Sequence, residues 1–204
     1  MKFRDFEEKI AELPVFRLND VRKLDSGFHR QQLSYWQDRK LIKSVGNGYY
    51  ILANKKIDES FLFMMANKIY EPSYISLESA LAYYQVIPES VLGVTSVTSR
   101  KTERVETEWG RLSYRQIKPE LLTGFEVVQQ VEGVKYKMAR LEKAVLDYLY
   151  LNSGIKDVID LEGLRWNKQV LTKLNDNKAF LSYLAIFDNK ALDLRVDQLF
   201  KYLN

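Results

Sequence analysis

Cysteine is absent from this chain, histidine occurs once, and no apolar run is long. Without cysteine the chain can form no disulfide, thiolate nucleophile or thiolate metal site. With His29 alone, neither a His-rich metal site nor a catalytic set with a second histidine can be built. No stretch approaches the ~18 apolar residues of a membrane span, and residues 1–13 are too charged for a signal peptide. We therefore expect a cytoplasmic protein with no membrane partner.

Positive charge is concentrated in the first quarter of the chain. Residues 1–57 carry 12 Lys and Arg residues against 7 Asp and Glu residues, whereas residues 58–134 carry 7 against 11 and residues 135–204 carry 12 against 9. This modest surplus favours contact with nucleic acid without proving it. At 204 residues with 46% hydrophobic content, the chain is long enough for one large or two small globular domains.

The stretch 26–52 has the pattern of a helix followed by a tight hairpin. At 100° per residue, Leu33 and Trp36 fall on one side of the helix, and we expect that side to face a core. Asn47 and Gly48 both tolerate positive φ, which favours a two-residue type I′ turn between the strand-like runs that flank them.

The outward side of this helix carries side chains that can form hydrogen bonds with base edges in a major groove. Helices of this kind make many of their contacts near their first residues, and the hairpin beside them can reach phosphates. The expected DNA-contacting residues are His29, Arg30, Gln31, Ser34, Tyr35, Lys43 and Asn47. A solvated helix face is the alternative interpretation of the same pattern, and a capping or packing role is the alternative for His29.

The preceding segment supports a DNA-binding unit. Apolar spacing predicts a helix over residues 2–13, ended by Pro14, then a short apolar run and a second helix capped by Asn19. Residues 25–27 form a turn, and Ser26 is a candidate N-cap for the next helix. Residues 1–57 therefore have the element order of a winged helix-turn-helix domain.

Residues 58–204 are predicted to form an α+β domain. Two helices, 58–70 and 77–84 with Ser76 as cap, precede β-branched and alternating runs between residues 91 and 138. We expect an antiparallel sheet of four or five strands with the helices packed on it, with hairpin turns at Trp109-Gly110 and Glu132-Gly133. A helix over 139–150 follows, and then two or three helices broken near Asp176-Asn177 and Asp188-Asn189.

The order of these motifs resembles the AbiEi family of bacterial antitoxins from abortive-infection, type IV toxin–antitoxin systems. The resembling stretches are YISLESALAYYQVIPE, GVTSVTSRKTERVETEWGRLSYRQI and YKMARLEKAVLDYLYL. They contain Ser76, Glu78 and Ser79 at a helix start, Gly110 in its hairpin, and Glu142, Lys143 and Asp147 on the later helix. The N-terminal segment is similar too, so the likeness covers nearly the whole chain. The C-terminal quarter matches only in its helical character.

The resemblance implies a two-part protein that needs no cofactor. Its winged helix would bind double-stranded operator DNA and repress its own operon, and its C-terminal part would neutralise a cognate nucleotidyltransferase-like toxin, with or without direct contact. We expect a monomer or weak dimer that binds DNA cooperatively. Two other classes stay open: a ligand-sensing winged-helix regulator without a toxin partner, and an enzyme acting on nucleic acid. The enzyme fits worst, because no set of nucleophile, base and orienting residue stands out. We therefore expect no catalytic residues and no enzymatic activity.

Two acidic groups have a simple structural interpretation. Lys143 and Asp147 at i, i+4 would form a surface ion pair rather than an acid–base group, with Glu142 favourable near a helix start. Glu103, Glu106 and Glu108 could bind a cation, but a solvated strand face explains them more simply.

Overall fold

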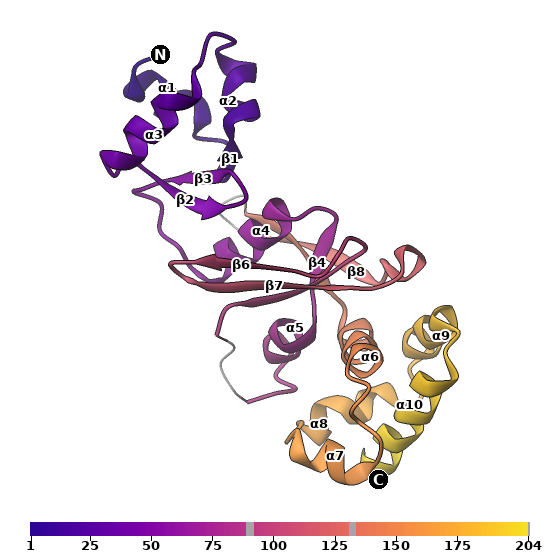
Figure 1. Ribbon diagram of the computed structural model, residues 1–204. Helices are drawn as coiled ribbons and strands as arrows, with labels where there is room; N and C mark the ends of the chain where they lie inside the picture. The colour runs from indigo at the N-terminus through magenta and orange to yellow at the C-terminus, as the bar shows by residue number, and fades with distance from the viewer. Residues whose placement is uncertain (89–91, 131–133, 204) are drawn as a thin grey trace.

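A computed structural model describes residues 1–88, 92–130 and 134–203 as an α+β fold. Figure 1 shows a small N-terminal unit at one end, a central sheet, and a group of helices at the other end, so the two termini lie far apart. No helix in the described part of the chain is long and apolar enough to cross a membrane. The predicted fold class, α+β, is confirmed.

The N-terminal unit contains three helices and a three-stranded antiparallel sheet. Its elements are α1 (Phe3–Ile10), β1 (Phe16–Arg17), α2 (Leu18–Leu24), α3 (Arg30–Asp38), β2 (Ile42–Gly46) and β3 (Tyr49–Leu52), and the strand order is β1-β3-β2. Its core is aromatic: the ring of Phe6 lies 4.5 Å from that of Trp36 and 5.2 Å from that of Phe16, centroid to centroid. Leu33 and Trp36 are buried, as predicted. The apolar face of α3 thus anchors the helix and turns its polar face outward.

Three predicted helix boundaries in this unit are wrong by a few residues. The first helix ends at Ile10, before Pro14. The second begins at Leu18, because Asp20 accepts a hydrogen bond from the backbone N–H of Arg17, so Asn19 lies inside the helix. Ser26 does not cap α3. The carboxylate of Asp25 binds the N–H of Gly27, and its carbonyl oxygen accepts from the N–H of Phe28, which delays the helix until after His29.

The turn between β2 and β3 is as predicted. Asn47 has a φ of 50° and Gly48 a φ of 75°. Both values belong to the left-handed region that a type I′ turn requires, and Asn and Gly are the residues that adopt it most readily.

The central sheet has six strands. Its elements and the helices that precede them are α4 (Glu59–Ile69), β4 (Ser73–Ile75), α5 (Leu77–Tyr83), β5 (Val94–Thr98), β6 (Glu103–Thr107), β7 (Gly110–Gln116), the 3-10 turn η1 (Pro119–Leu121), β8 (Phe125–Gln129) and β9 (Lys135–Ala139). The strand order is β6-β7-β5-β4-β9-β8. In Figure 1, α4 lies on the side of the sheet nearer the N-terminal unit, and α5 and α6 (Leu141–Leu151) lie on the other.

The sheet is mixed, so the predicted antiparallel sheet of four or five strands is wrong. β5 pairs with β7 and β4 with β9 in parallel, whereas the β6–β7 and β8–β9 hairpins are antiparallel as expected. The missed strand, β4, is only three residues long and stands between two helices, where alternation cannot be recognised. The expected strand start at Val91 and turn at Glu132-Gly133 lie outside the described residues.

Four helices follow α6 in the described part of the chain, rather than two or three. They are α7 (Val158–Gly163), α8 (Lys168–Leu171), α9 (Lys178–Phe187) and α10 (Lys190–Leu203), with the 3-10 turn η2 (Thr172–Leu174) after α8. Both predicted breaks are confirmed. Asn177 caps α9 by accepting from the N–H groups of Ala179 and Phe180, and Asp188 ends it with a φ of 41°.

The N-terminal unit packs directly against the rest of the molecule. Val15, Val45, Tyr49 and Ile51 belong to the same buried apolar cluster as the central sheet. The junction is tightest at Gly46, where a Cβ atom would lie 2.3 Å from a methyl group of Val105 on β6. Gly46 also has a φ of 94°, which side chains rarely adopt.

We predict that Gly46→Ala lowers the free energy of unfolding by more than roughly 1 kcal/mol, because it combines backbone strain with a clash against Val105. Gly48→Ala is the matched control: its φ is also positive, at 75°, but no atom lies within 4 Å of the new Cβ. Urea unfolding of both variants measures the difference. Equal losses for the two variants would mean that the contact with β6 contributes nothing.

Candidate functional site

The outward face of α3 presents a row of hydrogen-bonding side chains. Of the residues singled out by sequence, Arg30, Gln31, Ser34 and Tyr35 on α3 and His29 before it are all exposed. Tyr35 is 52% exposed, and the guanidinium of Arg39 lies 4.8 Å from its ring centroid. The ring is therefore held against a cation at the surface, and the helix offers both donors and acceptors to a ligand.

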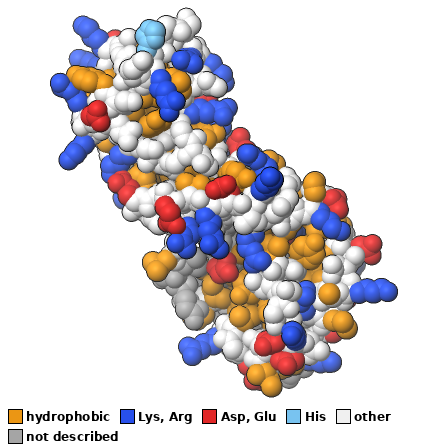
Figure 2. Space-filling view, viewed as in Figure 1, with side chains coloured by type: hydrophobic (Ala, Val, Ile, Leu, Met, Phe, Trp, Pro, Cys, Tyr) orange, Lys and Arg blue, Asp and Glu red, His pale blue; other side chains and the backbone are white. Residues whose placement is uncertain are grey.

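The start of α3 lies beside the β2–β3 turn. Arg30 and Gly48 line one shallow hollow of about 270 Å³, together with Arg17, Asn19 and Tyr50. Two arginine side chains thus line the hollow. Asn47, next to Gly48 in the β2–β3 turn, is exposed. Figure 2 shows Lys and Arg side chains around this end of the molecule, with the single histidine at its tip. Arg17 was not predicted as a site residue, because only the folded chain brings it next to Arg30.

Lys43 does not join this group. Its ammonium forms an ion pair with Glu108, 2.5 Å from the carboxylate oxygen, and lies 5.2 Å from the ring centroid of Trp109. Both partners belong to the turn between β6 and β7. The expectation that Lys43 projects toward phosphates stays a prediction, because this ion pair is exposed, with side-chain exposures of 42% for Lys43 and 50% for Glu108. The separation of 65 residues between the partners hides this contact from sequence patterns.

A second polar cluster lies inside the molecule. Lys143 is 1% exposed and Asp147 is fully buried, so the expectation of a surface ion pair is wrong. Lys143 binds Asp147 through a close ion pair and donates to the Tyr74 hydroxyl at 2.8 Å. The hydroxyls of Tyr74 and Ser76 each donate to the other Asp147 oxygen, also at 2.8 Å. Ser76, predicted as a helix cap, forms no cap hydrogen bond because its hydroxyl serves this cluster.

Burial and pairing act in opposite directions on these two charges. Burial lowers the pKa of Lys143 and raises the pKa of Asp147, while the attraction between them offsets both shifts. Aromatic rings close the site: the ammonium lies 4.7 Å from the ring centroid of Phe187 and 5.4 Å from that of Tyr74. Within the described residues, neither charge lines the hollows around α3, along the central sheet or beside β8. The cluster therefore holds β4 against α6 from inside the core.

The remaining acidic candidates are dispersed. Glu142 accepts a hydrogen bond from Asn177, Glu106 pairs with Arg111, and Glu108 pairs with Lys43. Glu103 and Glu106 are exposed on β6 but point to opposite faces of the strand, so they do not form one acidic face. Within the described residues, no three His, Asp or Glu side chains are arranged to hold a metal ion.

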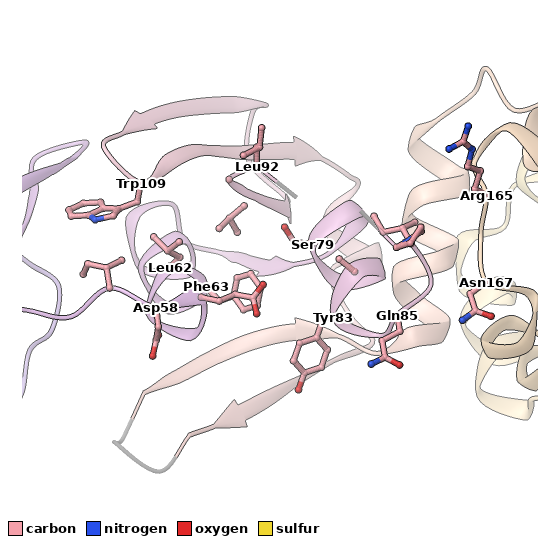
Figure 3. A pocket seen from close by; sticks show the side chains of 17 residues that line it. Asp58, Leu62, Phe63, Ser79, Tyr83, Gln85, Leu92, Trp109, Arg165 and Asn167 are labelled. Atoms are coloured by element: carbon pink, nitrogen blue, oxygen red, sulfur yellow. The ribbon is translucent and has the colours of Figure 1, made fainter. Parts of the chain in front are cut away.

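A hollow of about 930 Å³ lies along the central sheet (Figure 3). Trp109 stands at the end nearest the N-terminal unit, Tyr83 and Gln85 project from the α5 segment, and Arg165 and Asn167 come from the connection between α7 and α8 at the other end. The hollow is lined by aromatic, amide and charged side chains. Trp109, which lines this hollow, is also the ring that the ammonium of Lys43 on β2 contacts.

Comparisons with protein-family models and with curated proteins give no match to this chain. The interpretation of the site consequently rests on its residues and geometry, together with the resemblance carried by the sequence motifs.

We predict that Asp147→Ala lowers the free energy of unfolding by roughly 3–5 kcal/mol, because it leaves the Lys143 ammonium buried without its counter-charge. The double variant Lys143→Met/Asp147→Leu removes both charges and should lose clearly less than the single one. Urea unfolding of the three proteins tests this. An Asp147→Ala protein within 1 kcal/mol of the wild type would contradict the prediction.

Proposed function

We propose that the protein is a DNA-binding antitoxin that represses its own operon through an N-terminal winged helix and neutralises a cognate nucleotidyltransferase-like toxin through residues 58–204. The observation that carries the DNA-binding half is the exposed row on α3, which stands beside the exposed turn of a hairpin. The toxin half is inferred from the resemblance of the motifs between Tyr74 and Leu151 to AbiEi antitoxins.

The chemistry of the α3 row suits a duplex. Arg30 can bind the O6 and N7 acceptors of guanine, and Gln31 can bind the N6 and N7 groups of adenine. Arg30 and Arg17 line the same hollow beside the hairpin turn, where Arg30 can neutralise a phosphate and Arg17 can do so in competition with Asp20. Burial of Leu33 and Trp36 fixes the helix, so that these contacts would cost little ordering on binding.

Lys43 and Arg17 each have a partner within the chain. Lys43 pairs with Glu108 and Arg17 lies 4.0 Å from Asp20, but both basic side chains are exposed, so a phosphate can compete with the carboxylate. The proposed DNA-contacting residues are His29, Arg30, Gln31, Ser34, Tyr35, Lys43 and Asn47, with Arg17 added as a phosphate contact.

We predict that Arg30→Ala and Gln31→Ala each weaken binding to the promoter duplex by roughly 1–3 kcal/mol, because each removes a base contact. Gln169→Ala is the matched control, since Gln169 is exposed on α8 at the other end of the chain, and it should bind like the wild type. Lys43→Ala should weaken binding less than Arg30→Ala does. Fluorescence anisotropy with promoter and scrambled duplexes over a salt series measures all four. Equal affinity of the wild type for both duplexes would refute sequence-specific binding.

A ligand-sensing regulator is the second candidate, favoured by the hollow that Trp109 lines. A small molecule bound against this ring would touch the residue on which Lys43 rests and could thereby shift the hairpin of the N-terminal unit. In that case the protein would have no toxin partner.

The two candidates differ in what they predict for cell growth. For the antitoxin, co-expression of the full-length chain with the product of the neighbouring gene should rescue growth. The Gln31→Ala variant should rescue equally well, because α3 lies outside residues 58–204. A regulator would give no rescue, and its melting temperature would rise with a metabolite instead. Loss of rescue in a folded Gln31→Ala protein would contradict the division into two functional parts.

A further inference from the structure

One edge of the central sheet is open. β8 stands at the end of the strand order and pairs with β9 alone among the described strands. The other edge strand of the sheet, β6, is not open in the same way, because Gly46 of β2 packs against Val105 of β6. An open strand edge carries unpaired N–H and C=O groups and is a template for another strand.

The hydrogen bonds that flank the β8–β9 ladder fix which backbone groups face outward. The N–H of Gln130 donates to the carbonyl of Val134, and the N–H of Arg140 donates to the carbonyl of Gly124. The pairs Gly124–Arg140 and Gln130–Val134 lie at the two ends of the same series as Glu126–Met138 and Val128–Tyr136, two residues apart at each step. Because bonded and non-bonded pairs alternate in an antiparallel ladder, the even-numbered residues of β8 bond to β9.

The odd-numbered residues of β8 therefore direct their N–H and C=O groups away from β9. These are Phe125, Val127 and Gln129. A second contact agrees: the N–H of Lys137, which stands opposite Val127, donates to the side-chain oxygen of Asn67 at 2.5 Å rather than to β8. The outer edge of β8 thus offers three residues with free donors and acceptors.

β8 lacks most of the features that protect an edge, although it is short and carries one acidic residue. Its sequence, FEVVQ, contains no Lys, Arg or Pro, and its pairing with β9 shows no bulge. Its only charge, Glu126, is paired with Arg140 at 3.5 Å. The Val127 side chain, at the centre of the strand, is 61% exposed. Exposed apolar residues on an unprotected edge indicate a contact surface.

We propose that two copies of this chain associate through antiparallel pairing of β8 with β8, with the two-fold axis at Val127. In this register Phe125 faces Gln129 of the partner subunit, and Glu126 faces Val128 of the partner subunit. No like charges oppose one another, so the strand is complementary to itself. The pairing joins the two six-stranded sheets into one continuous sheet.

The apolar surface beside the edge extends this contact. Val127 also lines a mostly apolar hollow of about 530 Å³ with Leu13, Pro14, Met64 and Tyr136. Leu13 is 39% exposed there. Side chains beside the edge can therefore add to the backbone hydrogen bonds. Since the strand is only five residues long, the association is weak and depends on protein concentration.

The absence of cysteine makes a direct test possible. Val127→Cys should form a disulfide-linked dimer of twice the 24.0 kDa chain mass under mild oxidation, because residues in a hydrogen-bonded antiparallel pair lie about 5.5 Å apart between Cα atoms. Leu194→Cys, 64% exposed on α10, is the matched control and should cross-link at least tenfold more slowly. Equal rates for the two variants would overturn the proposal.

Sedimentation equilibrium of the uncross-linked protein provides the second test. The wild type should shift toward twice its mass as its concentration rises, and Val127→Pro should stay at 24.0 kDa. Proline at this position removes an outward N–H and no β8–β9 bond, so circular dichroism should confirm an unchanged fold. A wild type that stays monomeric at every concentration, or a Val127→Pro protein that still dimerises, would overturn the proposal. Neither test involves DNA or a toxin, so their outcome is independent of the proposed function.

Discussion

The ion pair between Lys143 and Asp147 is the constraint on which the central part of the molecule depends. Two charges lie inside an apolar core, and they are tolerated only because each is satisfied: Asp147 accepts from Lys143, Tyr74 and Ser76, and Lys143 also binds the Tyr74 hydroxyl. The cost of moving these charges out of water can exceed their attraction, so the pair need not add stability. What it does is tie β4 to α6, because Tyr74 of β4 and Ser76 just after it bind Lys143 and Asp147 of α6.

Packing around this pair reinforces the same geometry. The side chain of Lys143 fills the space beside Gly124, where an added Cβ would lie 2.9 Å from its Cγ. Phe125, the next residue and the first of β8, stacks on Tyr74 with ring centroids 5.1 Å apart. The buried cluster therefore sets the position of β8 as well as that of β4. The exposed edge of β8 is thus held in place by contacts with the buried Lys143 and Tyr74.

The sequence allowed the local features to be predicted and left most of the long-range ones hidden. The inward side of α3 follows from the spacing of Leu33 and Trp36, and the hairpin turn follows from the backbone preferences of Asn47 and Gly48. Lys143 and Asp147 have the i, i+4 spacing of a common surface pair, and only tertiary packing makes them buried. The parallel pairing of β4 with β9 was missed because a three-residue strand carries no usable alternation. The parallel pairing of β5 with β7 was missed because strand order is a long-range feature: β6 lies outside β7 rather than beside β5.

The engagement of Lys43 has a consequence for the proposed DNA contact. A hairpin that is free to move could adapt to a duplex, but β2 is held to the β6–β7 turn by an ion pair, by the Trp109 ring and by the close fit of Gly46 against Val105. The α3 face is built on the same small core as that hairpin, through Trp36 and Phe6. Its orientation is therefore set by the central sheet. In the proposed function, α3 would therefore be presented to a duplex in an orientation fixed by the junction, where Val15, Val45, Tyr49 and Ile51 share one apolar cluster with the central sheet.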